Sequence, residues 1–309
     1  MKRAINRPRK SLWARMKKHK YIYLMLLPVV IYYIVFHYLA MGGLVIAFQN
    51  YKPKLGILGS KWVGLKHFED FLTGKYAWRV IRNTLVLNLY LLLFGFPAPI
   101  ILALLMNELR DNAYKKTLQT VSYMPHFVST VVLVSMINNI CSPSIGVLAK
   151  IWKSMGLTPV NWLAVPDYFY GINIVSGLWQ CIGWNAVIYI SAIAGIDQSL
   201  YEAARMDGAN RWKQILHVTI PGIMPTFILL LIMQIGQLMN CVFDKIWLLQ
   251  NTLNMQVSEM LPTYVYRLGM VSQKYGQATA GGLLNSVISV TLVLIANFVS
   301  RKVSETSLF

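Results

Sequence analysis

The sequence predicts an all-α integral membrane protein with six transmembrane helices. Hydrophobic residues make up 56% of the 309 residues and charged residues only 13%, whereas about a quarter of the residues in a soluble globular domain are charged. The mean hydropathy is +0.50. Six apolar stretches are long enough to cross a bilayer, which takes about 20 helical residues. Because the strands of a membrane β-barrel are only about ten residues long and alternate strictly, helices are the expected element.

The expected spans lie, in chain order, at 21–48, 81–106, 121–140, 169–196, 220–243 and 281–299. The first follows a basic segment, as in a signal peptide, but it is too long for one and lacks a small-residue cleavage site, so we expect it to be retained. The third and fifth contain Asn, Gln and Ser, which blurs the pattern. Proline removes a backbone donor and favours a kink. Four prolines are expected to kink the spans, either as ordinary structural kinks or as hinges: Pro28, Pro97, Pro99 and Pro125.

The distribution of Lys and Arg predicts the orientation. The net charge is +18, and nine of the 29 basic residues precede Tyr21. Six spans place both termini on one side of the membrane. That side comprises the two terminal segments and the loops 107–120 and 197–219, and it carries 17 of the 29 basic residues. Cytoplasmic loops carry an excess of basic residues. We therefore expect a multi-pass protein of the cytoplasmic (inner) membrane, in contact with membrane lipid and with both termini in the cytoplasm.

Several other classes are disfavoured. No nucleic-acid-binding motif accompanies the positive charge, so no nucleic-acid partner is expected. The three cysteines are odd in number and have no CxxC spacing, which gives no support for a disulfide framework or a zinc site. There is no GxSxG or HExxH motif and no pair of carboxylates within one span. We expect neither catalytic residues nor a metal or other cofactor.

The most informative segment lies between the fourth and fifth spans and reads YEAARMDGANRWKQILHVTIPGIMP, residues 201–225. Good helix formers at its start predict a short helix. Gly208 can adopt the positive φ of a tight helix end, and Asn210 can cap a second helix. Apolar residues at helical spacing follow, and Pro221 opens the next span. A helix pair with small residues on one face is suited to docking in a groove of another protein.

This segment resembles the EAA signature of permease subunits of binding-protein-dependent ABC importers. The signature is Glu-Ala-Ala, three residues, Gly, nine residues, Ile, one residue and Leu-Pro. Here Val218 replaces the Ile and Ile220 the Leu, and both keep the apolar character. Four further segments resemble the oligosaccharide- and polysaccharide-importer permeases of the LplB type: MGGLVIAFQNYK (41–52), WVGLKHFEDF (62–71), GFPAPIILALLMNELR (95–110) and QTVSYMPHFVS (119–129).

The resemblance implies a type I ABC-importer permease fold of the MetI-like kind. It implies a basic cytoplasmic N-terminal tail (1–20), a first transmembrane helix with an extracytoplasmic loop (21–80), a five-helix permease core (81–300) that carries a cytoplasmic coupling loop (197–219), and a cytoplasmic C-terminal tail (301–309). The implied partners are a dimer of ATP-binding cassette ATPases, a second permease subunit and an extracytoplasmic sugar-binding protein. The sequence has no GxxxxGK[ST] phosphate loop of its own, so ATP hydrolysis is expected in a separate subunit.

The resemblance also implies roles within the coupling loop. Glu202 would contact polar or basic groups of the ATPase, Ala203 and Ala204 would permit close approach, and Gly208 would form the turn. The residues expected to couple the chain to the ATPase are Glu202, Ala203, Ala204, Asp207, Gly208, Ala209 and Pro221.

Two polar stripes predict where a sugar passes, because polar groups within spans usually face the interior of the bundle. At 100° per residue, one stripe follows the fifth span (Gln234, Gln237, Asn240, Cys241 and Asp244) and the other the fourth (Asn173, Ser176, Gln180, Trp184 and Ser191). We expect the substrate to contact Gln180, Trp184, Gln234, Gln237 and Asn240. The alternative for each of them is a hydrogen bond between helices.

The function that the sequence predicts is carbohydrate import, most simply of an oligosaccharide, driven by a separate ATPase. The alternative is a proton-coupled secondary sugar transporter without an ATPase partner. That mechanism needs an ionisable residue deep in a span, and the middles of the six expected spans contain no Asp or Glu. A channel or a membrane enzyme would not need the EAA loop.

Overall fold

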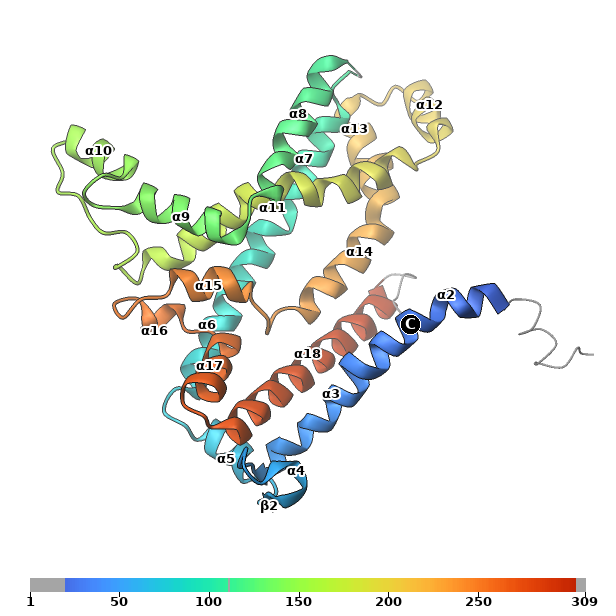
Figure 1. The fold of residues 1–309 in the computed structure, drawn as a ribbon. Helices are drawn as coiled ribbons and strands as arrows, with labels where there is room; N and C mark the ends of the chain where they lie inside the picture. Colours follow the sequence, from blue (N-terminus) through green and yellow to red (C-terminus); the bar gives the residue numbers. More distant parts are fainter. Residues whose placement is uncertain (1–19, 111, 304–309) are drawn as a thin grey trace, which may run out of the picture.

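The computed structural model describes residues 20–110 and 112–303 (Figure 1). Nearly all of the two predicted tails therefore lies outside the described residues. Among those residues, five helices are long and apolar enough to cross a membrane. A sixth span is obtained if a sharply bent helix pair is counted as one. The described chain is thus the predicted helical membrane protein, with one span that is not straight.

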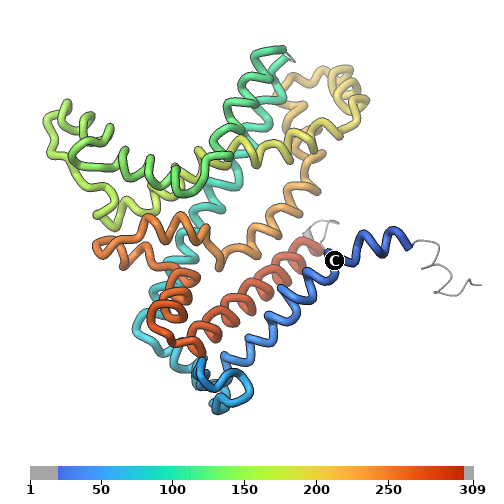
Figure 2. The backbone as a smooth tube through the Cα atoms, in the orientation of Figure 1, coloured from blue at the N-terminus to red at the C-terminus, as the bar shows by residue number. Residues whose placement is uncertain are grey.

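The first span is the least buried. It comprises α2 (Lys20–Tyr33), a π-helical turn η1 (Ile34–Tyr38), α3 (Leu39–Met41) and a 3₁₀ segment η2 (Gly42–Phe48). None of its most apolar 18-residue window is buried, as expected of a helix that faces lipid. Its later part runs alongside the last helix (Figures 1 and 2). A small outer layer follows, made of β1 (Gln49–Asn50), α4 (Gly56–Gly59), β2 (Lys61–Trp62) and α5 (Lys66–Leu72); β1 and β2 pair antiparallel.

The second span contains a π-helical turn beside two prolines. It comprises α6 (Ala77–Tyr90), a π-helical turn η3 (Leu91–Gly95) and α7 (Pro97–Asn107). Pro97 and Pro99 lack the backbone N–H that a regular helix would direct at the preceding turn, and the wider π-turn lies directly before them. A π-helical turn therefore lies beside the two prolines at which a kink was predicted.

The third predicted span is broken. Helix α8 (Ala113–Tyr123) passes through a 3₁₀ turn η4 (Met124–Phe127) that contains Pro125, and α9 (Thr130–Cys141) then leaves at 95°. Val128 is extended, with ψ 126°, so its carbonyl no longer belongs to a helix. The Gln180 side-chain amide donates a hydrogen bond of 3.0 Å to that carbonyl. The break is stabilised from the neighbouring span, as it must be where lipid offers no hydrogen bonds.

The fourth span is the long helix α11 (Tyr168–Ala194), which α10 (Val147–Ser154) precedes in the chain. It crosses α7 and α8 near the middle of the molecule (Figure 1). Close approach to α8 depends on Gly183, because a Cβ atom there would overlap the backbone of Ser122. Ala186 and Tyr189 of α11 are buried against Ala103 of α7. These contacts make α11 the central element of the fold.

The fifth span ends earlier than predicted. Helix α12 (Gln198–Met206) and α13 (Arg211–Gln214) lie in the loop before it, and a π-helical turn η5 (Ile215–Thr219) leads into α14 (Ile220–Gly236). The predicted span continued to residue 243. Gly236 is buried, and a Cβ atom there would meet Val293 of the last helix. The helix therefore ends at a glycine that is packed against the last span.

Short helices fill the distance to the last span. They are α15 (Phe243–Leu249), α16 (Met255–Ser258), α17 (Leu261–Tyr266) and the π-helical turn η6 (Arg267–Val271), followed by the long helix α18 (Tyr275–Val303). Leu249 and Met260 of this segment are buried with residues of α6, α9 and α11. The segment is therefore part of the core.

We expect Gly183→Ala to destabilise the protein by about 3 kcal/mol, because the added methyl group would collide with the Ser122 backbone, which cannot rotate away. The measurement is the thermal midpoint of the detergent-solubilised protein, followed by fluorescence-detected size exclusion. Gly171→Ala on the same helix is the control, since a Cβ atom there meets nothing within 4 Å. Equal midpoints for the two variants would contradict the close approach of α8 and α11.

Candidate functional site

The loop between the fourth and fifth spans forms a capped helix–turn–helix. Asp197 accepts a hydrogen bond of 2.9 Å from the Ser199 backbone N–H at the start of α12. The Ser199 backbone and hydroxyl hydrogen bonds also hold the pKa of the Asp197 carboxyl below its usual value. Asn210 caps α13 by accepting 3.0 Å from the Lys213 N–H. The predicted cap at Asn210 is confirmed.

Gly208 forms the turn between these helices. Its φ is +74°, the left-handed region that favours glycine. Its N–H donates to the Arg205 carbonyl, and the Ala209 N–H donates to the Ala204 carbonyl at 2.9 Å. This pair of hydrogen bonds is a Schellman helix end. The predicted positive φ at Gly208 is confirmed, and a Cβ atom there would meet nothing within 4 Å.

The same loop exposes large apolar side chains. Met206 is 89% exposed and Trp212 73% exposed. Glu202, Ala203, Asp207 and Pro221 are also exposed, while Ala204 and Ala209 are half-buried. A soluble loop would rarely present such side chains together, and exposed apolar clusters of this kind mark interaction sites.

Two contacts fix the loop against the spans. The Tyr201 hydroxyl is hydrogen-bonded to the Thr219 hydroxyl at 2.9 Å, which ties α12 to the turn η5. Arg211 forms an ion pair of 3.7 Å with Glu108 at the end of α7. The loop is thus held beside the end of the second span, and α4, α5 and β2 lie at the opposite end of the molecule (Figure 1).

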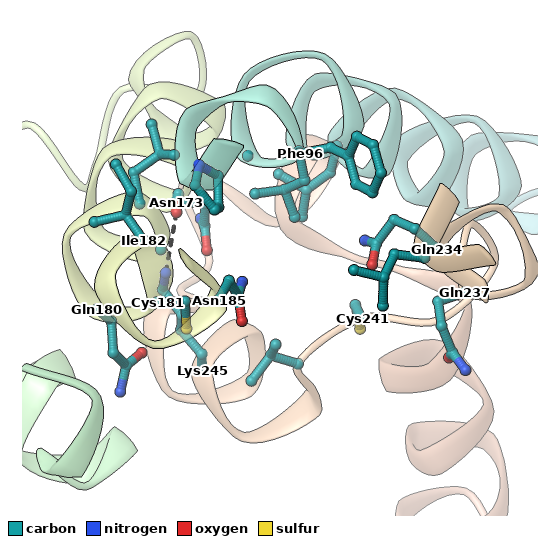
Figure 3. Close-up of a pocket in the computed structure, with 18 of the residues that line it drawn as sticks. Phe96, Asn173, Gln180, Cys181, Ile182, Asn185, Gln234, Gln237, Cys241 and Lys245 are labelled. Atoms are coloured by element: carbon teal, nitrogen blue, oxygen red, sulfur yellow. Dashed lines mark hydrogen bonds between the residues drawn. The ribbon is translucent and has the colours of Figure 1, made fainter. Parts of the chain in front are cut away.

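A cavity of about 420 Å³ lies among the second, fourth and fifth spans and α15 (Figure 3). That volume is within the range of small-molecule sites. Its wall is mostly aliphatic, with a few polar groups. The polar and thiol side chains that line it are Asn173, Gln180, Cys181, Asn185, Tyr189, Gln234, Gln237, Cys241 and Lys245.

The structure separates the five predicted substrate-path residues. Gln234 and Gln237 line the cavity. Gln180 also lines it, but its amide nitrogen donates a hydrogen bond to the Val128 carbonyl. In Figure 3 its side chain points away from Gln234. Trp184 lies outside the cavity and stacks on His126, with ring centroids 4.5 Å apart. Asn240 is also outside, and it donates to the Gln237 side-chain oxygen and accepts from Asn285.

Sequence reasoning missed two groups in the cavity. Asn185 belongs to α11 but lies on a different side from the predicted stripe, and its amide forms no hydrogen bond with the described residues. Lys245 belongs to α15, and its ammonium group donates to the Asn173 carbonyl at 3.0 Å. The only signal in the sequence was a lone lysine beside the fifth span.

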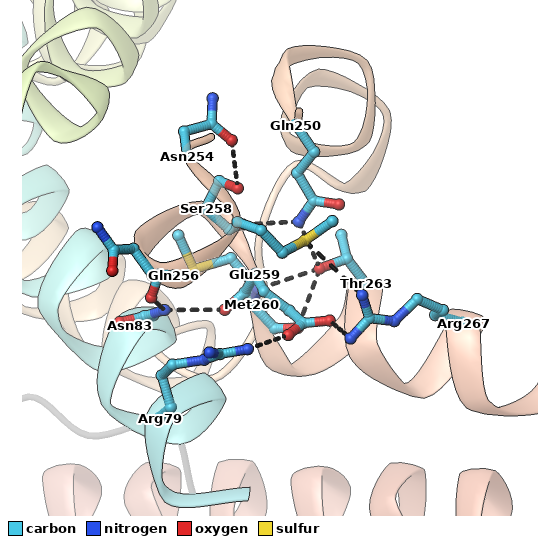
Figure 4. Close-up of polar contacts among 11 residues, drawn as sticks. Arg79, Asn83, Gln250, Asn254, Gln256, Ser258, Glu259, Met260, Thr263 and Arg267 are labelled. Atoms are coloured by element: carbon cyan, nitrogen blue, oxygen red, sulfur yellow. Dashed lines mark hydrogen bonds and ion pairs between the residues drawn. The ribbon is translucent and has the colours of Figure 1, made fainter. Parts of the chain in front are cut away.

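A buried polar network holds the segment that carries Lys245 (Figure 4). Glu259 is 1% exposed and forms ion pairs with Arg79, at 2.8 Å, and with Arg267. Asn83 of α6 donates to the backbone carbonyls of Gln256 and Glu259. Further along α6, Asn88 donates to the carbonyls of Leu238 and Asn240. Polar side chains of one span thereby supply hydrogen-bond donors to the backbone carbonyls of the irregular segment.

Comparisons with known proteins agree on one family. The family model described as "Binding-protein-dependent transport system inner membrane component" matches residues 95–305. The chain is 40% identical to Protein LplB of Bacillus subtilis, over 97% of this chain and 94% of that protein. It is also 40% identical to the polygalacturonan/rhamnogalacturonan transport system permease protein YteP of the same organism, over 97% and 94% of the two chains.

A solved structure is similar over the whole fold. A chain in the crystal structure of a bacterial alginate ABC transporter, in complex with an alginate pentasaccharide-bound periplasmic protein, superposes with a TM-score of 0.89. The sequences are 37% identical, and the match covers 97% of this chain and all of that one. The arrangement of spans is therefore shared with a transporter.

We expect Glu259→Gln to lower the stability by about 3 kcal/mol, because it leaves two arginines beside a site without a counter-charge. This is the lower end of the range for a buried pair, since each arginine is about a third exposed. The thermal midpoint in detergent is the measurement. Glu69→Gln removes an exposed carboxylate of α5 and is the control. If the two variants melt together, the network does not hold the segment.

Proposed function

Because the chain belongs to the family of binding-protein-dependent transport system inner membrane components, we propose that it couples sugar passage to a separate ATPase through the loop 197–219. The chain is a permease of an ABC importer for sugars or polysaccharides, and it is an integral membrane protein. Its membership of this family favours the importer over the proton-coupled alternative. The oligosaccharide substrate, the coupling role of the loop and the partner subunits belong to the proposal.

The observation that carries the proposal is the exposed helix–turn–helix. Its large apolar side chains are mostly exposed, yet caps and a Schellman turn fix the backbone that carries them. A rigid helix pair with exposed Met206 and Trp212 is what a groove on a second protein would bind. We assign Glu202, Ala203, Ala204, Asp207, Gly208, Ala209 and Pro221 to this docking element. The occupant we propose is one subunit of an ATP-binding cassette dimer.

The remaining partners follow from the relatives. The alginate transporter was crystallised with a periplasmic binding protein, and we propose that an extracytoplasmic sugar-binding protein also delivers substrate to this chain. A second permease subunit would close the side of the cavity that this chain leaves open. Both termini would face the cytoplasm of the inner membrane, on the side of the docking element.

Gly208→Trp is expected to abolish co-purification of the ATPase, because the bulky side chain would stand in the docking turn. The C-terminally tagged chain would be extracted from native membranes in mild detergent, and its partners identified by mass spectrometry. Gly156→Trp is the matched control, since Gly156 is exposed, has the same φ of +74° and also faces open space. A native chain that brings no ATPase would refute the importer, and equal recovery with both variants would refute the coupling loop.

Gln234→Ala and Gln237→Ala are each expected to reduce sugar uptake about tenfold while expression and partner recovery stay normal. Both side chains line the cavity, and the Gln234 amide has no hydrogen-bond partner among the described residues, so it is available to sugar hydroxyls. The measurement is uptake of labelled sugar by cells that express each variant. Gln256→Ala removes an exposed amide outside the cavity and is the control. Normal uptake by both cavity variants would remove these residues from the path.

A further inference from the structure

One charged group stands in a cavity that is otherwise neutral. The lining residues include no Asp, Glu, Arg or His, and Lys245 is their single charged member. Its side chain is 6% exposed. Within the part of the chain that the structure describes, no carboxylate lies within 4.0 Å of its ammonium nitrogen. The positive charge is therefore buried without a counter-charge.

Such a charge is costly, and helix packing does not require it. The Asn173 carbonyl accepts one hydrogen bond from the ammonium group, which has three donors. A neutral glutamine could make the same contact without the desolvation cost of an ion. Ionisable residues inside membrane proteins mark substrate or ion pathways, proton relays, voltage sensors or counter-ions of a ligand.

The ammonium group lies close to a small residue of the cavity wall. A Cβ atom at Gly177 of α11 would lie 3.6 Å from the nitrogen, which is an ordinary van der Waals distance. The rest of the cavity supplies uncharged groups, among them the amides of Asn185 and Gln234 (Figure 3). One fixed cation among neutral amides is complementary to a sugar that has both hydroxyl and carboxylate groups.

We propose that Lys245 is a specificity-determining residue that binds the carboxylate of an acidic sugar as it crosses this cavity. The ligand class is therefore a uronic-acid oligosaccharide. This inference rests on the proposed function, which it narrows from carbohydrate to anionic carbohydrate. It assigns the charge to Lys245 and the sugar hydroxyls to Asn185 and Gln234. The competing role is a structural link between α15 and α11 through the Asn173 carbonyl.

The test uses two probes with the same skeleton: trigalacturonate and its fully methyl-esterified form, which has no charge. The importer, purified with its partners and reconstituted in liposomes with its binding protein, would be assayed for uptake of each. Lys245→Gln removes the charge but keeps a donor for Asn173. Lys54→Gln removes the same charge from an exposed outer loop and controls for general attraction of anions.

The expected result is a fall of at least about tenfold in trigalacturonate uptake for Lys245→Gln, with ester uptake within twofold of the native importer and Lys54→Gln unchanged. The native importer could accept only the acid. In that case the assignment is supported if Lys245→Gln loses uptake but its ATPase is still stimulated by the loaded binding protein. It is overturned if Lys245→Gln loses both uptake and ATPase stimulation. Unchanged acid uptake, an equal fall for both sugars, or a native importer that takes only the ester also overturns it. A native importer that moves neither sugar yet imports a neutral oligosaccharide overturns the inference and keeps the proposed function. If no sugar is imported at all, the proposed function fails as well.

Discussion

The structure depends on satisfying backbone hydrogen bonds wherever a helix breaks inside the membrane, because lipid offers no partner to an exposed carbonyl or N–H. Gln180 supplies a donor at the break between η4 and α9. Asn83 and Asn88 do the same for the irregular chain after α14. These hydrogen bonds, with the apolar packing among α6, α9, α11 and α15, hold the elements around the cavity. The cavity is the space that remains between elements held in this way.

This constraint explains which sequence-based predictions were correct. Long apolar runs predicted the spans, and local turn chemistry predicted the cap at Asn210 and the positive φ at Gly208, because both depend only on neighbouring residues. The 95° bend was not predicted. Pro125 indicated a kink, but the break is also held by a hydrogen bond from Gln180, which lies 52 residues away from its partner in the chain.

The candidate site was predicted less well, since polarity along a helix does not distinguish a side chain that lines a cavity from one that stabilises a backbone. Gln180 does both, and Asn240 contacts its neighbours instead of the cavity. The helical stripe on the fifth span was also extended beyond Gly236, where the helix ends. Positions beyond that residue follow a different geometry. Lys245 therefore reaches the cavity from a short helix that periodicity could not place.

One continuous helix connects the loop 197–219 to the cavity. Trp212 lies at the exposed start of a helix that runs through η5 and α14, and Gln234 lies near its other end, about 30 Å away at 1.5 Å per residue. In the proposed coupling, a subunit bound at Trp212 would act on this helix, which carries part of the cavity wall. The π-turn at Ile215–Thr219 and the two prolines that follow it are the weakest points of its hydrogen bonding. Bending at that point would let the loop move while Gly236 stays packed on α18. The proposed coupling of loop movement to the cavity wall therefore depends on how stiff the first turns of α14 are.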